Sequence, residues 1–341
     1  MLDTLKTLCA LPGVSGNEDA VRAYIEKEAA PYADELRTDA MGNLIVFKRG
    51  KARPKGKVLL AAHMDEVGVI VTEITDQGYL KFSFVGGIDR RVVLGKRVFI
   101  GKNAVPGVIG LKAFHLAEGD EAEKIPPLKA LYIDVGAQSR EEAERLVSLG
   151  DFGHFDPTIV EFGDGWLKAK AIDDRIGCAV MLTLLKEELP VDTWFAFTVQ
   201  EELGCRGAFG AAFSVKPDYA LVLEGTTAAD LPSQKGGAKV CIPGKGPVIP
   251  FMDGGAVYDR GLFERLRALA IAHEIPWQTK TYISGGTDAQ AIQKTAGGAH
   301  VAAVSAAVRY IHSPSSVACT RDLPHMVTLA RLFLESLNSE L

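Results

Sequence analysis

Short apolar strands alternate with helices through the second half of the chain, and this alternation limits the possible folds more than any other feature. The elements that the pattern predicts are strands at 194–199, 219–223 and 301–304 and helices at 175–188, 258–273 and 323–337. Strands that alternate with helices form a mixed or parallel sheet whose two faces are both covered. We therefore predict an α/β fold, with a mixed sheet and helices on both faces.

The N-terminal part supplies further elements of the same sheet. Apolar runs at 43–47 and 57–62 predict two strands, and the second of them is buried. A helix before them stops at Pro31. The residues Ser15 and Glu18 have the spacing of a capping box, which predicts that they close the N-terminus of this helix.

The pattern changes between Gly68 and Gly163. Short β-type runs are separated there by glycine and polar turn residues, which is typical of a small β-rich domain. We predict an α/β domain made of residues 1–67 and 165–341, with a small β-barrel-like domain, 68–164, inserted into it.

Composition excludes several classes of protein. The 341 residues include 43 acids and 38 lysines and arginines, so the net charge is −5 and neither a nucleic-acid partner nor an anionic membrane surface is expected. Five scattered cysteines without a C-x-x-C pair argue against a disulfide framework and for a reducing compartment. Since the first residues also lack the pattern of a signal peptide, we expect a cytoplasmic protein.

Acids and histidines cluster at the ends of the predicted core elements. They are His63 with Asp65, Asp173 with Asp174, Glu201 with Glu202, Glu224, and His312. A single acid at a strand end is usually a solvated surface charge. The carboxyl ends of strands in an open α/β sheet form a common ligand-binding rim, however. We therefore expect the five groups to converge in space.

Imidazole and carboxylate together are the ligand set of zinc and related divalent cations. Two histidines and three carboxylates suit two ions that share a bridging carboxylate. Such a pair activates a water and polarises a carbonyl, and the reaction then needs a further carboxylate as general base. Adjacent Glu201 and Glu202 can divide this work, one binding a metal and the other facing the water. Asp65 can accept the second ring N–H of His63 and fix its tautomer.

Six segments follow one another along almost the whole chain; five carry these residues, and the sixth, 285–289, is a glycine-containing loop that is a candidate part of the active site. They are residues 61–68, 171–177, 199–204, 223–230, 285–289 and 309–314. Together the segments resemble the glutamyl aminopeptidase family, which includes the tetrahedral aminopeptidases and proteins labelled endoglucanase M. The resemblance implies removal of N-terminal residues from peptides, by a site that holds two divalent metal ions per subunit, zinc or cobalt.

The resemblance also assigns roles to residues. It implies that His63, Asp173 and Glu224 hold one ion. Asp173 then bridges to a second ion, which Glu202 and His312 complete. Glu201 becomes the general base and Asp65 the partner of His63.

Three further implications concern the backbone, one substitution and the assembly. Relatives hold the peptide bond that matches Asp173–Asp174 in the cis form. Many have a glutamate where this chain has Ser316, which puts support for His312 in question. The family implies a homo-oligomer: a dodecamer of tetrahedral shape that is built from dimers, whose subunits pair through the inserted domain.

Two other hypotheses remain open from the sequence. A related metal-dependent deacylase would use the same site on acylated amino acids. A catalytically silent scaffold would keep the fold with a vestigial site, although all five predicted ligands are present.

Overall fold

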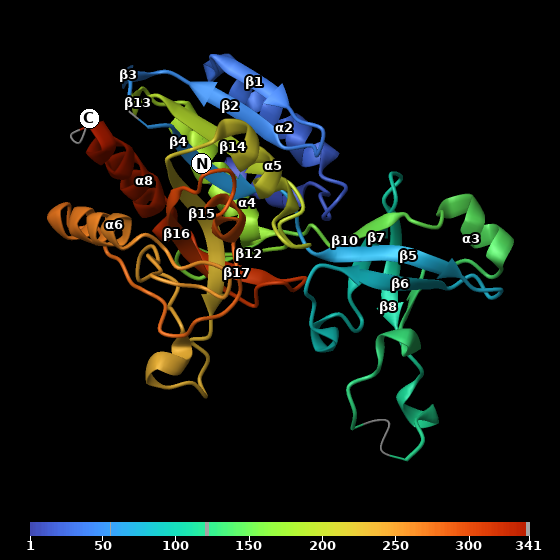
Figure 1. The fold of residues 1–341 in the computed structure, drawn as a ribbon. Helices are drawn as coiled ribbons and strands as arrows, with labels where there is room; N and C mark the ends of the chain where they lie inside the picture. Colours follow the sequence, from blue (N-terminus) through green and yellow to red (C-terminus); the bar gives the residue numbers. More distant parts are fainter. Residues whose placement is uncertain (55, 120–122, 339–341) are drawn as a thin grey trace.

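The computed structural model describes residues 1–54, 56–119 and 123–338. A nine-stranded sheet runs through its centre in the order β1-β2-β14-β4-β15-β16-β17-β12-β11 (Figure 1). Its strands are β1 Glu35–Thr38, β2 Leu44–Lys48, β4 Val58–His63, β11 Val160–Phe162, β12 Trp166–Ala169, β14 Thr193–Thr198, β15 Tyr219–Ala228, β16 His300–Arg309 and β17 Ser316–Cys319. The four central strands, β14, β4, β15 and β16, are parallel, and the flanking pairs are antiparallel. The predicted mixed sheet is confirmed.

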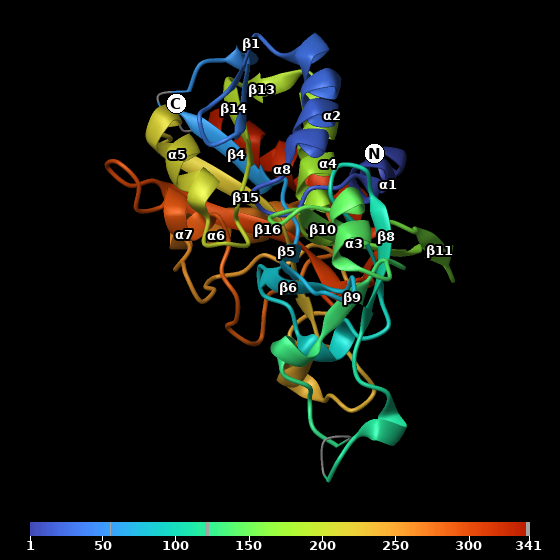
Figure 2. The same cartoon turned by 90° about the vertical axis from the view of Figure 1, so that its right-hand side faces the viewer.

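Helices cover both faces of this sheet (Figure 2). On one face lie α1 Leu2–Ala10, α2 Asp19–Ala29, α4 Ile172–Leu185, α6 Arg260–Ala272 and α8 Asp322–Asn338, and on the other lie α5 Arg206–Val215 and α7 Ala289–Ile292. Strand side chains point alternately to the two faces of the sheet. Leu60 of β4 therefore packs into the core on the α4 side, while Leu59 and Ala61 pack into the core on the α5 side. All six residues of β4 are buried, and full burial of each leucine contributes roughly 1.5–3 kcal/mol.

The β-rich segment folds as a closed barrel in the order β10-β5-β6-β9-β8-β7. Its elements are β5 Gly68–Ile74, β6 Leu80–Val85, β7 Arg97–Ile100, β8 Val105–Gly110, β9 Tyr132–Asp134, α3 Arg140–Leu146 and β10 Phe152–Phe155. The barrel projects to one side of the central sheet (Figure 1). The last strand of the barrel, β10, ends at Phe155. The next strand, β11, pairs with β12 of the central sheet and lies a few residues before the boundary predicted at 164.

A short parallel pair completes the strands: β3 Gly50–Ala52 lies beside β13 Leu189–Val191. All five cysteines are free and buried, in agreement with the absence of a disulfide framework expected from the sequence.

Two sequence predictions are wrong in detail. Ser15 and Glu18 do not form a capping box: α2 begins at Asp19, and the side chain of Glu18 makes no cap hydrogen bond. Ser15 instead donates a hydrogen bond to Asp65, because the loop before α2 lies against the end of β4. Glu224 does not follow its strand either. It lies inside β15, which continues to Ala228 because its pairing with β16 extends that far.

Candidate metal centre

The predicted site residues meet at the carboxyl edge of the four parallel strands. His63 is the last residue of β4, Glu201 and Glu202 follow β14, Glu224 lies in β15, and His312 follows β16. Parallel strands bring their carboxyl ends to the same edge, which is why residues far apart in sequence share one place. Asp173, at the start of α4, completes the group, and its peptide bond to Asp174 is cis.

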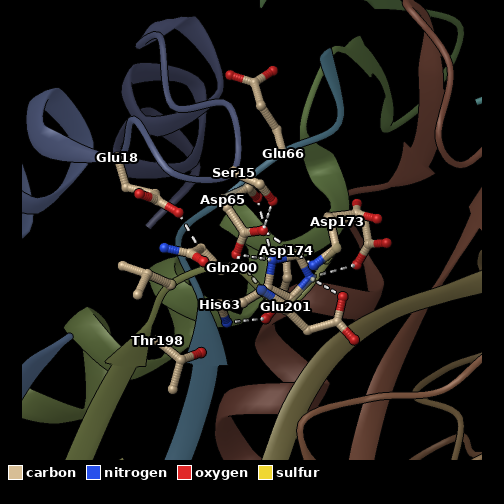
Figure 3. A network of polar contacts seen from close by, with 12 residues as sticks. Ser15, Glu18, His63, Asp65, Glu66, Asp173, Asp174, Thr198, Gln200 and Glu201 are labelled. Atoms are coloured by element: carbon tan, nitrogen blue, oxygen red, sulfur yellow. Dashed lines mark hydrogen bonds and ion pairs between the residues drawn. The ribbon is translucent and has the colours of Figure 1, made fainter. Parts of the chain in front are cut away.

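Three of these side chains surround one point. His63, Asp173 and Glu224 are buried, and their ligand atoms all lie within 4.8 Å of one another. The Nε2 atom of His63 lies 3.6 Å from Oδ1 of Asp173 and 3.6 Å from Oε1 of Glu224. In Figure 3 the labelled Asp173 lies beside the ring of His63. This set matches the first ligand group predicted from the sequence.

A second group shares Asp173 with the first. Asp173, Glu202 and His312 also have ligand atoms within 4.8 Å of one another. The Nε2 atom of His312 lies 3.4 Å from Oδ2 of Asp173 and 3.4 Å from Oε2 of Glu202. The two oxygens of Asp173 therefore face two different imidazoles, as a bridging carboxylate requires.

The donor set fits divalent cations. His63 Nε2, Asp173 Oδ1 and Glu224 Oε2 are buried and have no hydrogen-bond partner among the described residues. Separations of 3.4–3.6 Å are too long for hydrogen bonds. They match neighbouring ligands of a tetrahedral ion, which lie about 3.3–3.6 Å apart when each ligand is about 2.0–2.2 Å from the metal. Buried polar atoms without partners are costly, and metal ligation at these atoms would remove that cost.

Burial disturbs the ionisation of the carboxyl groups. It raises the pKa of Glu202 to about 8 and that of Glu201 to about 7. Burial, with the neighbouring Asp174 carboxyl, holds the pKa of Glu224 well above its ordinary value. Buried carboxylates at such short range repel one another, and positive charge between them stabilises their ionised forms.

The pKa values of both histidines are raised as well, which for an imidazole favours the charged form. Burial alone lowers the pKa of His312, but the nearby carboxylates of Asp173 and Glu202 outweigh it and raise that pKa to about 9. Burial also disfavours ionised Asp173, yet His312 and His63 hold its pKa well below the usual range. The two imidazoles therefore balance only part of the negative charge of the site, and bound cations would stabilise it.

Asp65 connects the two halves of the site (Figure 3). Its Oδ1 lies 3.4 Å from Nδ1 of His63, which is hydrogen-bonded to the backbone carbonyl oxygen of Asp65 at 3.2 Å. The same Oδ1 accepts the Glu201 N–H at 3.0 Å. Its Oδ2 accepts the Glu202 N–H at 3.1 Å and the hydroxyl of Ser15. Because one buried carboxylate contacts both the His63 ring and the turn that carries the two glutamates, Asp65 fixes their relative position.

Other supporting residues were missed by the sequence reasoning. Glu18 accepts hydrogen bonds from the N–H groups of Gly16, at 2.7 Å, and Gln200, at 3.1 Å, and so holds the turn before Glu201. Asp174 accepts the His63 N–H at 3.1 Å. The sequence placed Asp174 beside the predicted ligand Asp173 but predicted no role for it. Nothing in the sequence distinguished Glu18 from an ordinary capping residue.

Ser316, which stands where many relatives have a glutamate, supports His312 through the backbone. Its buried hydroxyl donates to the carbonyl oxygen of Tyr310 at 3.1 Å. Tyr310 and His312 both have positive φ angles, 56° each, in the turn after β16. Ser316 thus stabilises the turn that carries His312.

A cavity of about 440 Å³ opens directly onto the site. Glu201, Glu202, Glu224 and His312 line one part of it, and Lys280 and the 284–287 loop line another. Residues 285–287 of this loop belong to the 285–289 segment of the family resemblance. Lys280 was missed, because no motif marked it.

Replacing Asp65 by Asn is expected to lower zinc affinity or turnover by about 10–100-fold, the usual effect of removing a carboxylate partner of a metal-binding histidine. Titration with zinc and steady-state kinetics would measure it. Ser15→Ala, which removes one neutral donor to the same carboxylate, provides the matched control and should cost much less. Equal effects of the two variants would contradict the role given to Asp65.

Comparisons with known proteins agree with this geometry. Residues 42–329 match the model of the M42 glutamyl aminopeptidase family. Lysyl aminopeptidase of Pyrococcus furiosus is 33% identical over 346 residues, covering 98% of this chain and 97% of the relative. Aminopeptidase APDkam598 from Desulfurococcus kamchatkensis has a TM-score of 0.93 and 36% identity, covering 98% of this chain and 94% of that one. The TET1 peptidase of Pyrococcus horikoshii has a TM-score of 0.85 and 34% identity, covering 97% and 98%.

Fold and site together define a metallopeptidase. The chain belongs to the M42 glutamyl aminopeptidase family, and its activity is that of an aminopeptidase. The family resemblance seen in the sequence is confirmed. Among the helices of the described residues, none combines the length and apolar character needed to cross a membrane.

Proposed function

We propose that the chain removes N-terminal residues from peptides with the help of two divalent cations, zinc or cobalt. His63, Asp173 and Glu224 would hold one ion, and Asp173, Glu202 and His312 the other. The observation that carries this proposal is the placement of Asp173, whose two oxygens face the two imidazoles at 3.6 and 3.4 Å. Two ions held in this way supply Lewis-acid chemistry: they activate a water and polarise the peptide carbonyl.

Glu201 is the proposed general base. Its Oε2 lies 3.9 Å from Nε2 of His63, so it faces the site without belonging to either ligand group. Burial raises its pKa to about 7, and a group with a pKa near the working pH can both take and return a proton. Glu201 takes a proton from the attacking water and returns it to the leaving amine.

The carboxylates of the site also favour a substrate with a free amine. Glu202 and Glu224, which are themselves proposed metal ligands, line the cavity, and a protonated or metal-directed α-amine is attracted to such a rim. An acylated amine carries no charge and would gain nothing from it. An aminopeptidase therefore fits the site better than the deacylase alternative.

A substrate panel tests the proposed function. Chain stripped with a chelator and reloaded with zinc or cobalt is given aminoacyl-anilides and, separately, N-acetyl-amino acids. We expect hydrolysis of the free-amine substrates only, and only after reloading. Preferred hydrolysis of the acetylated compounds would identify a deacylase, and no hydrolysis with two ions bound would support a silent scaffold.

Lys280 suggests which N-terminal residue is preferred. It is the one lysine or arginine among the described residues that line the cavity, and it is 8% exposed. Its Nζ donates to the carbonyl oxygen of Ser284 at 3.0 Å, which leaves two of the three ammonium protons for other acceptors. A buried cation favours an anionic partner and repels a basic one. We propose that the cavity prefers substrates with N-terminal Glu or Asp.

Lys280→Met is expected to lower kcat/KM for a glutamyl substrate by at least about 30-fold, because truncating one partner of a buried charge pair costs about 2 kcal/mol or more. The same variant should change kcat/KM for a leucyl substrate by less than about threefold. Parallel kinetics on both substrates measure the difference. A uniform loss on both substrates would show that Lys280 acts on folding or catalysis rather than on specificity.

We also propose a homo-oligomer that pairs through the inserted domain, 68–164. The TET1 peptidase of Pyrococcus horikoshii can assemble into a tetrahedron or a large octahedral shell. In this chain, the described residues between β8 and β9, 111–119 and 123–131, project away from the central sheet (Figure 2). They include exposed Phe114, Leu116 and Ile125, with Phe114 82% exposed. Exposed apolar side chains gathered in one segment mark an association surface. Light scattering of the purified chain would distinguish monomer, dimer and dodecamer.

A further inference from the structure

We propose that Glu201, Cys205 and Asp288 form a third cation site, separate from the two ligand groups that share Asp173. It would bind a thiophilic divalent cation such as Cd²⁺, or Zn²⁺ in excess, and it would make the enzyme sensitive to inhibition by these metals. The inhibitory consequence rests on the proposed role of Glu201 as general base. The binding itself does not.

Three elements bring the three side chains together. Glu201 lies in the turn after β14, Cys205 precedes the first residue of α5, and Asp288 precedes the first residue of α7. One ligand atom from each residue lies within 4.8 Å of the others. The Sγ atom of Cys205 is 3.3 Å from Oε1 of Glu201, while the other oxygen of Glu201 faces His63. Glu201 thus stands between the main site and this third group.

Asp288 gives independent evidence for a ligand. Its side chain is completely buried. Its Oδ2 accepts a hydrogen bond from the hydroxyl of Thr198, but its Oδ1 has no hydrogen-bond partner among the described residues. A buried carboxylate oxygen without a partner is expensive. A cation between this carboxylate, the Cys205 sulfur and Glu201 would supply the missing interaction.

The chemistry of the group differs from that of the main site. Thiolate sulfur is a soft ligand that selects zinc and related metals, whereas the main groups use imidazole and carboxylate. On binding, the S–H bond of Cys205 breaks, its proton passes to solvent, and a sulfur–metal bond forms without any redox change. Gln290 places its Nε2 3.0 Å from the sulfur and donates a hydrogen bond to it, although burial and the carboxyls of Asp288 and Glu201 raise the pKa of the Cys205 thiol.

The position of the site determines its effect. Glu201 lines the substrate cavity, so a metal can reach the group by way of its carboxylate. A cation that holds the Glu201 carboxylate competes with the proton that a general base has to accept. Activity should therefore rise as the two main sites fill and fall again at higher zinc or cadmium concentrations.

Metal stoichiometry tests the proposal without relying on activity. The full chain is dialysed against Cd²⁺, and bound metal is counted per chain together with the ultraviolet charge-transfer band of a cadmium–thiolate bond. We expect three ions and this band for the parent chain, and two ions without the band for Cys205→Ala and Cys205→Ser. Cys241→Ala, which removes another buried cysteine, is the matched control and should keep three ions.

Two results would overturn the site: a parent chain that binds two ions with no thiolate band, or a Cys205→Ala chain that still binds three. If Cys205→Ala and Cys205→Ser do not fold, Asp288→Asn replaces them and should also bind two ions.

Inhibition supplies the second measurement. The activity of each variant is expressed relative to its own rate at low metal concentration. The concentration of Cd²⁺ that halves this activity should be about 100-fold higher for Cys205→Ala than for the parent chain. Loss of a direct ligand should weaken binding by more than loss of an outer partner of a metal ligand usually does. If the chain binds three ions but hydrolyses no peptide, the third site stands and the proposed function fails. If it hydrolyses peptides but excess Cd²⁺ inhibits parent and variant equally, the proposed function stands and the inhibitory role of the third site is wrong.

Discussion

Replacing Glu201 by Gln is expected to lower kcat by about 10²–10⁴-fold, the usual contribution of a general acid–base group, while two ions per chain remain bound. The amide has the size and shape of the carboxylate but cannot take a proton from water. Glu201 belongs to neither of the two ligand groups that contain Asp173, so its charge is not needed to retain the metals. Steady-state kinetics and metal analysis on the same sample measure both parts of this prediction.

The outcome that contradicts this role is specific. Turnover within about tenfold of the parent chain, with metal content unchanged, would show that another group moves the proton. Loss of an ion in Glu201→Gln would instead make Glu201 a ligand and exchange its role with that of Glu202. The sequence alone could not decide between these two glutamates, because they are adjacent.

Replacing Asp173 by Asn is expected to weaken both ions at once and to abolish turnover at ordinary metal concentrations. Its two oxygens face His63 and His312 separately, and a neutral amide offers one weakly basic oxygen in place of two charged ones. The loss of affinity should exceed the roughly 10–100-fold that follows removal of an outer partner. Calorimetric titration of the metal-free chain with zinc would measure it.

Glu224→Gln and Glu202→Gln are the matched comparisons. Each removes a carboxylate that belongs to one ligand group only, so each should weaken one binding step and leave the other near its parent value. If Asp173→Asn also weakens a single step, the carboxylate does not bridge, and the two groups are independent sites.

The convergence of the site was predictable because it depends on strand order and polarity. His63, Glu201 and His312 each come near the end of an apolar run, and parallel strands bring such ends to one edge. The same rule was less accurate for Glu224, which lies within β15 rather than after it. Periodicity shows where an apolar run stops, but it does not show that polar residues continue to pair with a neighbouring strand.

The supporting residues were not predictable, because their roles depend on contacts between distant segments. Ser15 and Glu18 fit a local helix-capping pattern, yet their hydrogen bonds go to Asp65 and to the backbone of Gln200. Local and long-range partners compete for the same short polar side chains, and only the packed loop decides between them. Lys280 likewise depends on the cavity that it lines, which the sequence does not show. Asp288 lies in the 285–289 segment that the resemblance included, but its complete burial could not be predicted from the sequence.

Anomalous diffraction from crystals of the chain grown with zinc tests the central claim most directly. We predict two strong peaks on either side of the Asp173 carboxylate, one in contact with His63 and Glu224 and the other in contact with Glu202 and His312. A single peak, or peaks that do not both contact Asp173, would contradict the account.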